Sequence, residues 1–174
     1  MHTHFHKSKN RGTTLIEVLV YIVIFAFLTV TVMNALIVTT KSFAATRSNH
    51  YMLDAGNSAM ERISREIRGA LSVDNSNSTF NSSPGILQLN TLDSNGAAKT
   101  VKFSVASQVL QLTENGTLTG DLTSGNVNVT SLIFRSITTT SGSAVKVELT
   151  IQDAKNTSSP AQNFYDTIIL RGGY

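Results

Sequence analysis

The longest uncharged run in the chain constrains its fold more than any other feature. This run extends from residue 18 to residue 40, which is 23 consecutive residues, and it begins VLVYIVIFAFLTV. About 20 apolar residues in a helix cross a bilayer core of ~30 Å, and lipid offers the backbone no hydrogen-bond partner, so the segment must satisfy its own polar groups. The run therefore predicts a membrane-spanning helix.

Basic residues precede this run and predict its orientation. Lys7, Lys9 and Arg11 account for the whole net charge of +3, and the acidic and basic residues after them balance. The positive-inside rule places the N-terminus of such a single-pass protein in the cytoplasm and the bulk of the chain outside. Because the charge excess lies in this leader, and no basic stripe with interleaved aromatic residues follows it, the sequence predicts no specific nucleic-acid partner.

Glu17 stands at the edge of the apolar run, where a carboxylate is costly. A charge at mid-bilayer costs about 2.5–3.5 kcal/mol, and a charge near one end costs less. The carboxylate could complement the positive end of the helix dipole. It could also contact the amine of its own chain at Thr13, four residues away on the same face. A third interpretation is that it neutralises a positive charge on a neighbouring subunit, and the residues alone leave all three open.

The segment from the basic leader to the apolar run resembles a type IV prepilin signal. The leader ends in Gly12, and TTLIEVLVYIVIF follows with Glu17 five residues after the glycine. The resemblance covers about residues 7–40, and this signal is shared by type IV pilins, competence pilins and the pseudopilins of type II secretion. It implies cleavage between Gly12 and Thr13, methylation of Thr13, and pairing of Glu17 with Thr13 of an adjacent subunit in assembly. Most members of the family have Phe where this chain has Thr13.

The same resemblance implies partners and a location. The partners are prepilin peptidase, other pilin or pseudopilin subunits, an assembly platform membrane protein with its cytoplasmic ATPase, and membrane lipid before assembly. The protein is expected first in the cytoplasmic membrane and then in an extracytoplasmic filament or pseudopilus. The segment MERISREIRGALSV (residues 60–73) resembles the helix end of minor pilins and J-type pseudopilins, which favours these over a major pilin.

Helical periodicity continues beyond the apolar run. The first Gly after the leader is Gly56, and Gly69 with the following Ser and Asn residues ends the pattern, so the sequence predicts one helix from Thr13 to about Leu71. Apolar and small residues recur at helical spacing in its second half: Leu53, Ala55, Ala59, Met60, Ile63, Ile67, Ala70 and Leu71. Two i,i+4 ion pairs, Glu61 with Arg65 and Arg62 with Glu66, are expected on its exposed side.

Beyond residue 75 the pattern changes to short alternating runs separated by turn residues. Six runs are typical of β-strands: residues 86–92, 100–105, 109–113, 127–137, 144–153 and 164–172. Asn115-Gly116 indicates a hairpin turn after the third run. These patterns predict six or seven antiparallel strands packed against the amphipathic half of the helix, which is a pilin-like α+β fold.

The expected organisation of the chain has four parts. Residues 1–12 form a cleaved basic leader, and residues 13–40 form the transmembrane or filament-core helix. Residues 41–71 continue this helix in amphipathic form, and residues 72–174 form a β-rich globular domain.

The sequence predicts no catalytic site, no cofactor and no metal site. There is no cysteine, so disulfides and thiolate chemistry are excluded. His2, His4 and His6 lie in the leader, which is expected to be removed, and His50 is expected on the surface of the helix. Acidic residues are scattered singly, and no nucleophile or phosphate-loop motif occurs.

Two classes of function fit these features better than an enzyme does. The first is a structural subunit of a pilus-like filament, which supports secretion, DNA uptake, adhesion or motility. The alternative is an extracytoplasmic β-rich binding module held by an ordinary signal anchor. The fixed spacing between Gly12 and Glu17 favours the first, because a plain anchor has no need of it.

Overall fold

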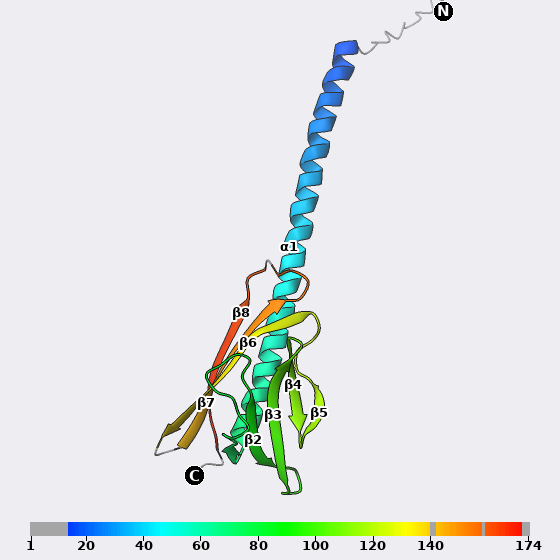
Figure 1. Cartoon of the computed structure of the whole chain (residues 1–174). Coiled ribbons are helices and arrows are strands. Elements are labelled where there is room, and N and C mark those ends of the chain that lie inside the picture. The colour runs from blue at the N-terminus through cyan, green and yellow to red at the C-terminus, as the bar shows by residue number, and fades with distance from the viewer. Residues whose placement is uncertain (1–13, 140–141, 158, 172–174) are drawn as a thin grey trace, which may run out of the picture. The chain divides into compact units, whose positions relative to one another are not determined.

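A computed structural model describes residues 14–139, 142–157 and 159–171 (Figure 1). The fold is α+β, with one long N-terminal apolar helix and a C-terminal domain of antiparallel strands, as predicted. The chain divides after Ala44 into two compact units, Met1–Ala44 and Ala45–Tyr174, and each is described by itself.

Helix α1 extends from Leu15 to Gly69, within two residues of the predicted bounds. Every described residue of the first unit, residues 14–44, is exposed, although most of these side chains are apolar. This helix is long and apolar enough to cross a membrane. A helix that is apolar all round is stable only where lipid or other apolar surfaces cover it.

Four threonines in this apolar segment satisfy their hydroxyls within the helix. Each hydroxyl donates to the backbone carbonyl four residues earlier, which leaves no hydroxyl proton to be paired by the surroundings. The four are Thr29, Thr31, Thr39 and Thr40, with Phe25, Phe27, Ala35 and Leu36 as their acceptors.

In the second unit, α1 buries one stripe of side chains. The stripe recurs at intervals of three and four residues and consists of Met52, Gly56, Ala59, Met60, Ile63 and Ile67 with two serines. Leu53 and Leu71, two of the apolar residues noted at helical spacing, are 41% and 46% exposed and do not belong to this stripe. Leu53 lies on the same side of the helix as Met60, seven residues before it, so its exposure reflects how far along α1 the sheets extend on that side and not its angle on the helix.

Among the described residues of this unit, eight strands form two antiparallel sheets. The sequence predicted six or seven strands and did not separate them into sheets. The first sheet has the order β1-β2-β3-β4-β5, with strands Ser72–Val73, Leu87–Leu92, Ala98–Ala106, Val109–Glu114 and Thr117–Asp121. The second has the order β6-β7-β8, with strands Val127–Thr139, Gly142–Asp153 and Gln162–Ile169. The six predicted runs correspond to β2, β3, β4, β6, β7 and β8, and the two-residue strand β1 was not predicted.

The predicted hairpin at Asn115-Gly116 is confirmed. Both residues have positive φ, at 49° and 79°, as a two-residue type I′ turn between β4 and β5 requires. The side-chain oxygen of Asn115 accepts the backbone N–H of Thr100 at 2.9 Å, and Asn115 N–H donates to the Thr100 carbonyl at 3.0 Å. The turn is therefore anchored to β3 as well as closing its own hairpin.

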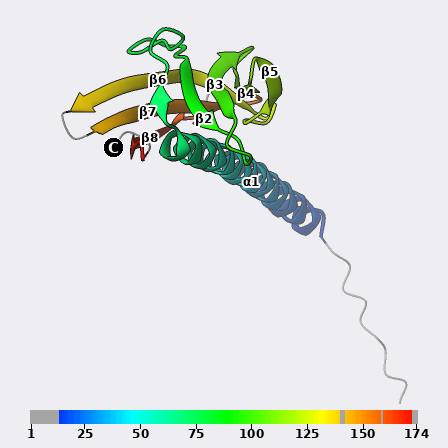
Figure 2. The same cartoon turned by 90° about the horizontal axis from the view of Figure 1, so that it is seen from below.

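One hydrophobic core joins the helix stripe to both sheets. Figure 2 shows the strands of both sheets on the same side of this part of α1. Phe103 of β3 and Phe134 of β6 are among its largest fully buried side chains. Strand β7 alternates as a half-buried strand should, and its buried apolar residues are Val145, Val147, Leu149 and Ile151.

Candidate functional site

The N-terminal end of α1 carries the acidic residue singled out by the sequence. The carbonyl of Thr14 accepts the backbone N–H groups of Glu17 and Val18 at 3.0 and 3.2 Å, which starts the helix. Glu17 lies in the first turn, where backbone N–H groups lack helical partners and a negative charge is favoured. Gly12 and Thr13 lie outside the described residues, so their roles in cleavage, methylation and assembly remain predictions.

The structure pairs Glu17 with Tyr21, which the sequence analysis did not anticipate. The Tyr21 hydroxyl donates to Glu17 Oε1 at 2.9 Å. The two side chains are one helical turn apart on the same face, and the i,i+4 spacing was the signal that could have predicted the contact. Tyr21 is 55% exposed, so its ring lies along the outside of the helix.

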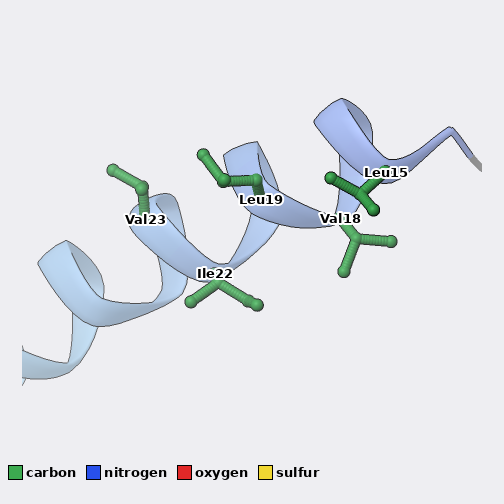
Figure 3. Close-up of a pocket in the computed structure, with 5 residues that line it drawn as sticks. All are labelled: Leu15, Val18, Leu19, Ile22 and Val23. Atoms are coloured by element: carbon green, nitrogen blue, oxygen red, sulfur yellow. The ribbon is translucent and has the colours of Figure 1, made fainter.

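The opposite side of this helix end is apolar. Leu15, Val18, Leu19, Ile22 and Val23 point toward a shallow groove of about 680 Å³ (Figure 3). At 100° per residue, Glu17 and Tyr21 face away from this groove. All five lining residues belong to one helix, so the groove is open surface suited to lipid or another apolar helix, and no polar side chain in it would orient a small molecule.

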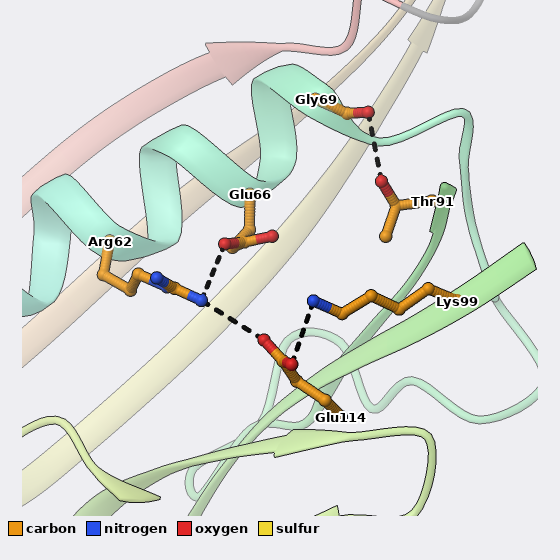
Figure 4. A network of polar contacts seen from close by, with 6 residues as sticks. All are labelled: Arg62, Glu66, Gly69, Thr91, Lys99 and Glu114. Atoms are coloured by element: carbon orange, nitrogen blue, oxygen red, sulfur yellow. Dashed lines mark hydrogen bonds and ion pairs between the residues drawn. The ribbon is translucent and has the colours of Figure 1, made fainter. Parts of the chain in front are cut away.

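An ion network connects α1 to the first sheet. Arg62 lies 3.0 Å from Glu66 on its own helix and 3.3 Å from Glu114 of β4, and Lys99 of β3 lies 2.9 Å from the same Glu114 (Figure 4). The pairing of Arg62 with Glu66 was predicted, but the prediction that this pair lies on the exposed side of the helix was wrong. Both side chains are mostly buried, because the sheet brings Glu114 to the same face of the helix.

A second network lies on β6 and β7. Arg135 donates to the two carboxylate oxygens of Glu148 at 3.0 and 3.3 Å, and Lys146 lies 2.8 Å from Glu148. Hydrogen bonds from Arg135 first and Lys146 second lower the pKa of Glu148 to about 2. The same contact raises the pKa of Arg135. These groups form a cross-strand ion pair, which fixes strand register.

In the part of the chain that the structure describes, no group of three or more His, Cys, Asp and Glu side chains could hold a metal ion. His50 is exposed on α1. The Glu148 carboxylate, whose pKa is lowered to about 2, is paired with Arg135 and Lys146. His2, His4 and His6 lie outside the described residues.

The chain matches one family model among known proteins. Residues 7–33 match the prokaryotic N-terminal methylation motif, and this match confirms the resemblance stated for the segment around Gly12 and Glu17. No curated protein and no solved structure matches the chain.

Proposed function

From the prepilin-type signal at residues 7–33, the signal of type IV pilins and pseudopilins, we propose that this chain is a structural subunit of a pilus-like filament. The motif indicates a pilin-like protein that prepilin peptidase processes and that assembles with other pilins. Within this class we propose a minor pilin or pseudopilin, which rests on the resemblance of residues 60–73. The filament would serve secretion, DNA uptake, adhesion or motility, and the chain would have no enzymatic role.

The observation that carries this proposal is the position of the motif directly on a helix that leaves its apolar side chains uncovered. The helix is long enough to span a membrane, and none of its described residues in the first unit is buried. Lipid can cover this surface before assembly, and the helices of neighbouring subunits can cover it afterwards. A subunit that moves from membrane to filament needs one surface suited to both environments.

Glu17 supplies the polar contact in this proposal. Cleavage after Gly12 would leave an ammonium group on Thr13, at the positive end of its own helix dipole, which disfavours it. The carboxylate of Glu17 on an adjacent subunit would neutralise that charge. Because opposite charges attract strongly where water is excluded, the pair would set the axial stagger between subunits.

The proposed organisation follows the four segments expected from the sequence. Residues 1–12 would be removed, residues 13–40 would form the filament core, and residues 41–71 would carry residues 72–174 as an outward-facing domain. The chain would enter the cytoplasmic membrane with its N-terminus inside. An assembly platform membrane protein and its cytoplasmic ATPase would then extract it into the filament.

Mass spectrometry of the N-terminus of the native protein tests this proposal. We expect a mature chain that starts at Thr13, and a methyl group on its amine would support N-methylation separately. The control is the same chain expressed in cells that lack prepilin peptidase, where Met1 should be retained. A chain that still starts at Met1 when the peptidase is present, or that starts near Ala45, would overturn the proposal in favour of an anchored or secreted binding module.

A further inference from the structure

The contact between Tyr21 and Glu17 engages one of the two oxygens of the carboxylate. Tyr21 donates to Oε1 of Glu17 at 2.9 Å. A carboxylate accepts about four hydrogen bonds, two at each oxygen. Among the described residues no side chain donates to Oε2, so that oxygen remains available to a further cation.

We propose that Tyr21 is the positioning residue for Glu17: its hydroxyl holds Oε1, fixes the carboxylate on one face of α1 and leaves Oε2 for the terminal amine of a neighbouring subunit. This inference rests on the proposed function, because it assumes that Glu17 pairs across a subunit boundary. It goes further in two respects: it assigns a second residue, Tyr21, to that pairing, and it states from which side of α1 the neighbouring subunit approaches.

The Tyr21–Glu17 hydrogen bond matters most where lipid surrounds the helix. A glutamate side chain has several rotatable bonds, and fixing it for one partner costs conformational entropy. Lipid supplies few donors, so a carboxylate there needs a protein partner before assembly. Tyr21 meets both needs at once. Because the ammonium would join the open oxygen, the Tyr21 bond need not be exchanged during assembly.

The geometry also limits the direction from which that neighbour arrives. Leu15, Val18, Leu19, Ile22 and Val23 line the apolar groove (Figure 3). At 100° per residue, Glu17 and Tyr21 face away from it. A subunit whose amine pairs with Glu17 therefore approaches the face of α1 that carries Glu17 and Tyr21. The apolar groove is left to a different neighbour or to lipid.

Infrared spectroscopy of the unassembled full-length mature chain tests the hydrogen bond itself. The chain is placed at low density in phosphatidylcholine bilayers with its five glutamates carboxyl-labelled with carbon-13. The difference spectrum against Glu17→Gln isolates the Glu17 carboxylate stretching band. We expect Tyr21→Phe to shift this band and Thr29→Val, which removes a hydroxyl bonded to its own helix, to leave it unchanged. An identical band in the wild type and Tyr21→Phe would overturn the inference.

Assembly in host cells tests the positioning role. The readout is the fraction of each variant in sheared filaments, with membrane level and cleavage measured in parallel to exclude folding defects. We expect Tyr21→Phe to reduce this fraction about three- to tenfold, as for loss of one hydrogen bond. Tyr21→Gln restores a donor at the same spacing and should recover part of it.

The outcomes separate this inference from the proposed function. If Glu17→Ala blocks assembly while Tyr21→Phe assembles like the wild type, the positioning role is wrong and the proposed function stands. If Glu17→Ala itself assembles normally, the intersubunit role of Glu17 fails and the role of Tyr21 fails with it.

Discussion

At the scale of single residues, we expect substitutions at two positions, Glu17 and Gly56, to have specific effects. Glu17 is the only acidic residue between residues 14 and 44, so any pairing in which that part of the helix supplies the negative charge depends on it. Gly56 lies on the buried stripe of α1, and the ring of Phe164 from β8 occupies the space where a side chain would begin. The first position concerns the proposed assembly, and the second concerns packing.

Replacing Glu17 with Ala should leave membrane insertion and cleavage intact but impair incorporation into filaments. The apolar run that drives insertion is unchanged, whereas the proposed partner of the Thr13 ammonium is lost. The measurement is the ratio of filament to membrane pools, determined by immunoblotting after shearing. Glu61→Ala removes an exposed carboxylate of the second unit and serves as the control. Normal incorporation of Glu17→Ala into filaments would contradict the intersubunit role and favour a role of Glu17 within its own chain.

Replacing Gly56 with Ala should destabilise the second unit by about 1–3 kcal/mol, as overpacking does. A β-carbon at this position would lie 2.1–2.6 Å from three atoms of the Phe164 ring, so the ring must move. The free energy of unfolding from denaturant titration in detergent measures the effect. Gly69→Ala is the matched control, because nothing lies within 4 Å of its β-carbon, and it should be neutral or stabilising by up to about 1 kcal/mol. Equal stability of the two variants would contradict the prediction.

At the scale of elements, charged residues connect strands to each other and to the helix. Glu114 of β4 receives Arg62 from α1 and Lys99 from β3. Glu148 of β7 receives Arg135 from the neighbouring strand β6 and Lys146 from its own strand. Each carboxylate accepts two cations, and protonation would weaken both contacts together.

Protonation of Glu148 should contribute to acid destabilisation of the second unit. Its pKa in the folded protein is about 2, against an ordinary value of 4.5, so the unfolded chain takes up the proton at higher pH. The stabilisation is therefore present above about pH 4.5 and is lost as the pH falls toward about 2. Thermal unfolding midpoints measured across this range should fall less steeply for Glu148→Gln than for the wild type.

The variant Arg135→Gln provides an independent check on this pH dependence. It removes the largest cause of the lowered pKa of Glu148 while keeping the carboxylate. The thermal unfolding midpoint of Arg135→Gln should also fall less steeply between about pH 4.5 and pH 2 than that of the wild type. If the midpoints of both variants fall with pH as steeply as those of the wild type, this ion pair does not contribute to acid destabilisation.

At the scale of the whole molecule, the two units differ in what stabilises them. The second unit has its own core, whose buried apolar residues lie between Met52 and Leu170. The described residues of the first unit have no buried side chain and leave an apolar helix to be covered from outside. The second unit therefore contains the contacts needed for its own folding.

A fragment that starts at Ala45 should fold without detergent. It retains the complete core, so it should unfold cooperatively and give dispersed amide signals in nuclear magnetic resonance spectra. A fragment that starts at Met60 lacks Met52, Gly56 and Ala59 and is the control, with an expected loss of at least about 2 kcal/mol. An unfolded Ala45 fragment would show that the first unit contributes to the stability of the second.

Much of the fold followed from local pattern. The bounds of α1, six strands and the Asn115-Gly116 turn were predicted because periodicity and turn chemistry depend on residues close together in the chain. The prepilin-type signal was recognised for the same reason, since the spacing from Gly12 to Glu17 is a property of the sequence alone. The contact of Tyr21 with Glu17 is equally local, because the two residues are four positions apart on one helix.

Long-range packing decided the rest. The separation of the strands into two sheets and the pairing of β1 with β2 depend on which strands meet, and no short segment encodes that choice. The exposure of Leu53 depends on how far along α1 the sheets extend on its side of the helix. Glu114 reaches Arg62 across 52 positions of sequence. The sequence by itself determined the helix, the strands and the signal, because these are local; the tertiary structure decided which faces are buried and which charges meet, because those depend on surfaces brought together only by folding.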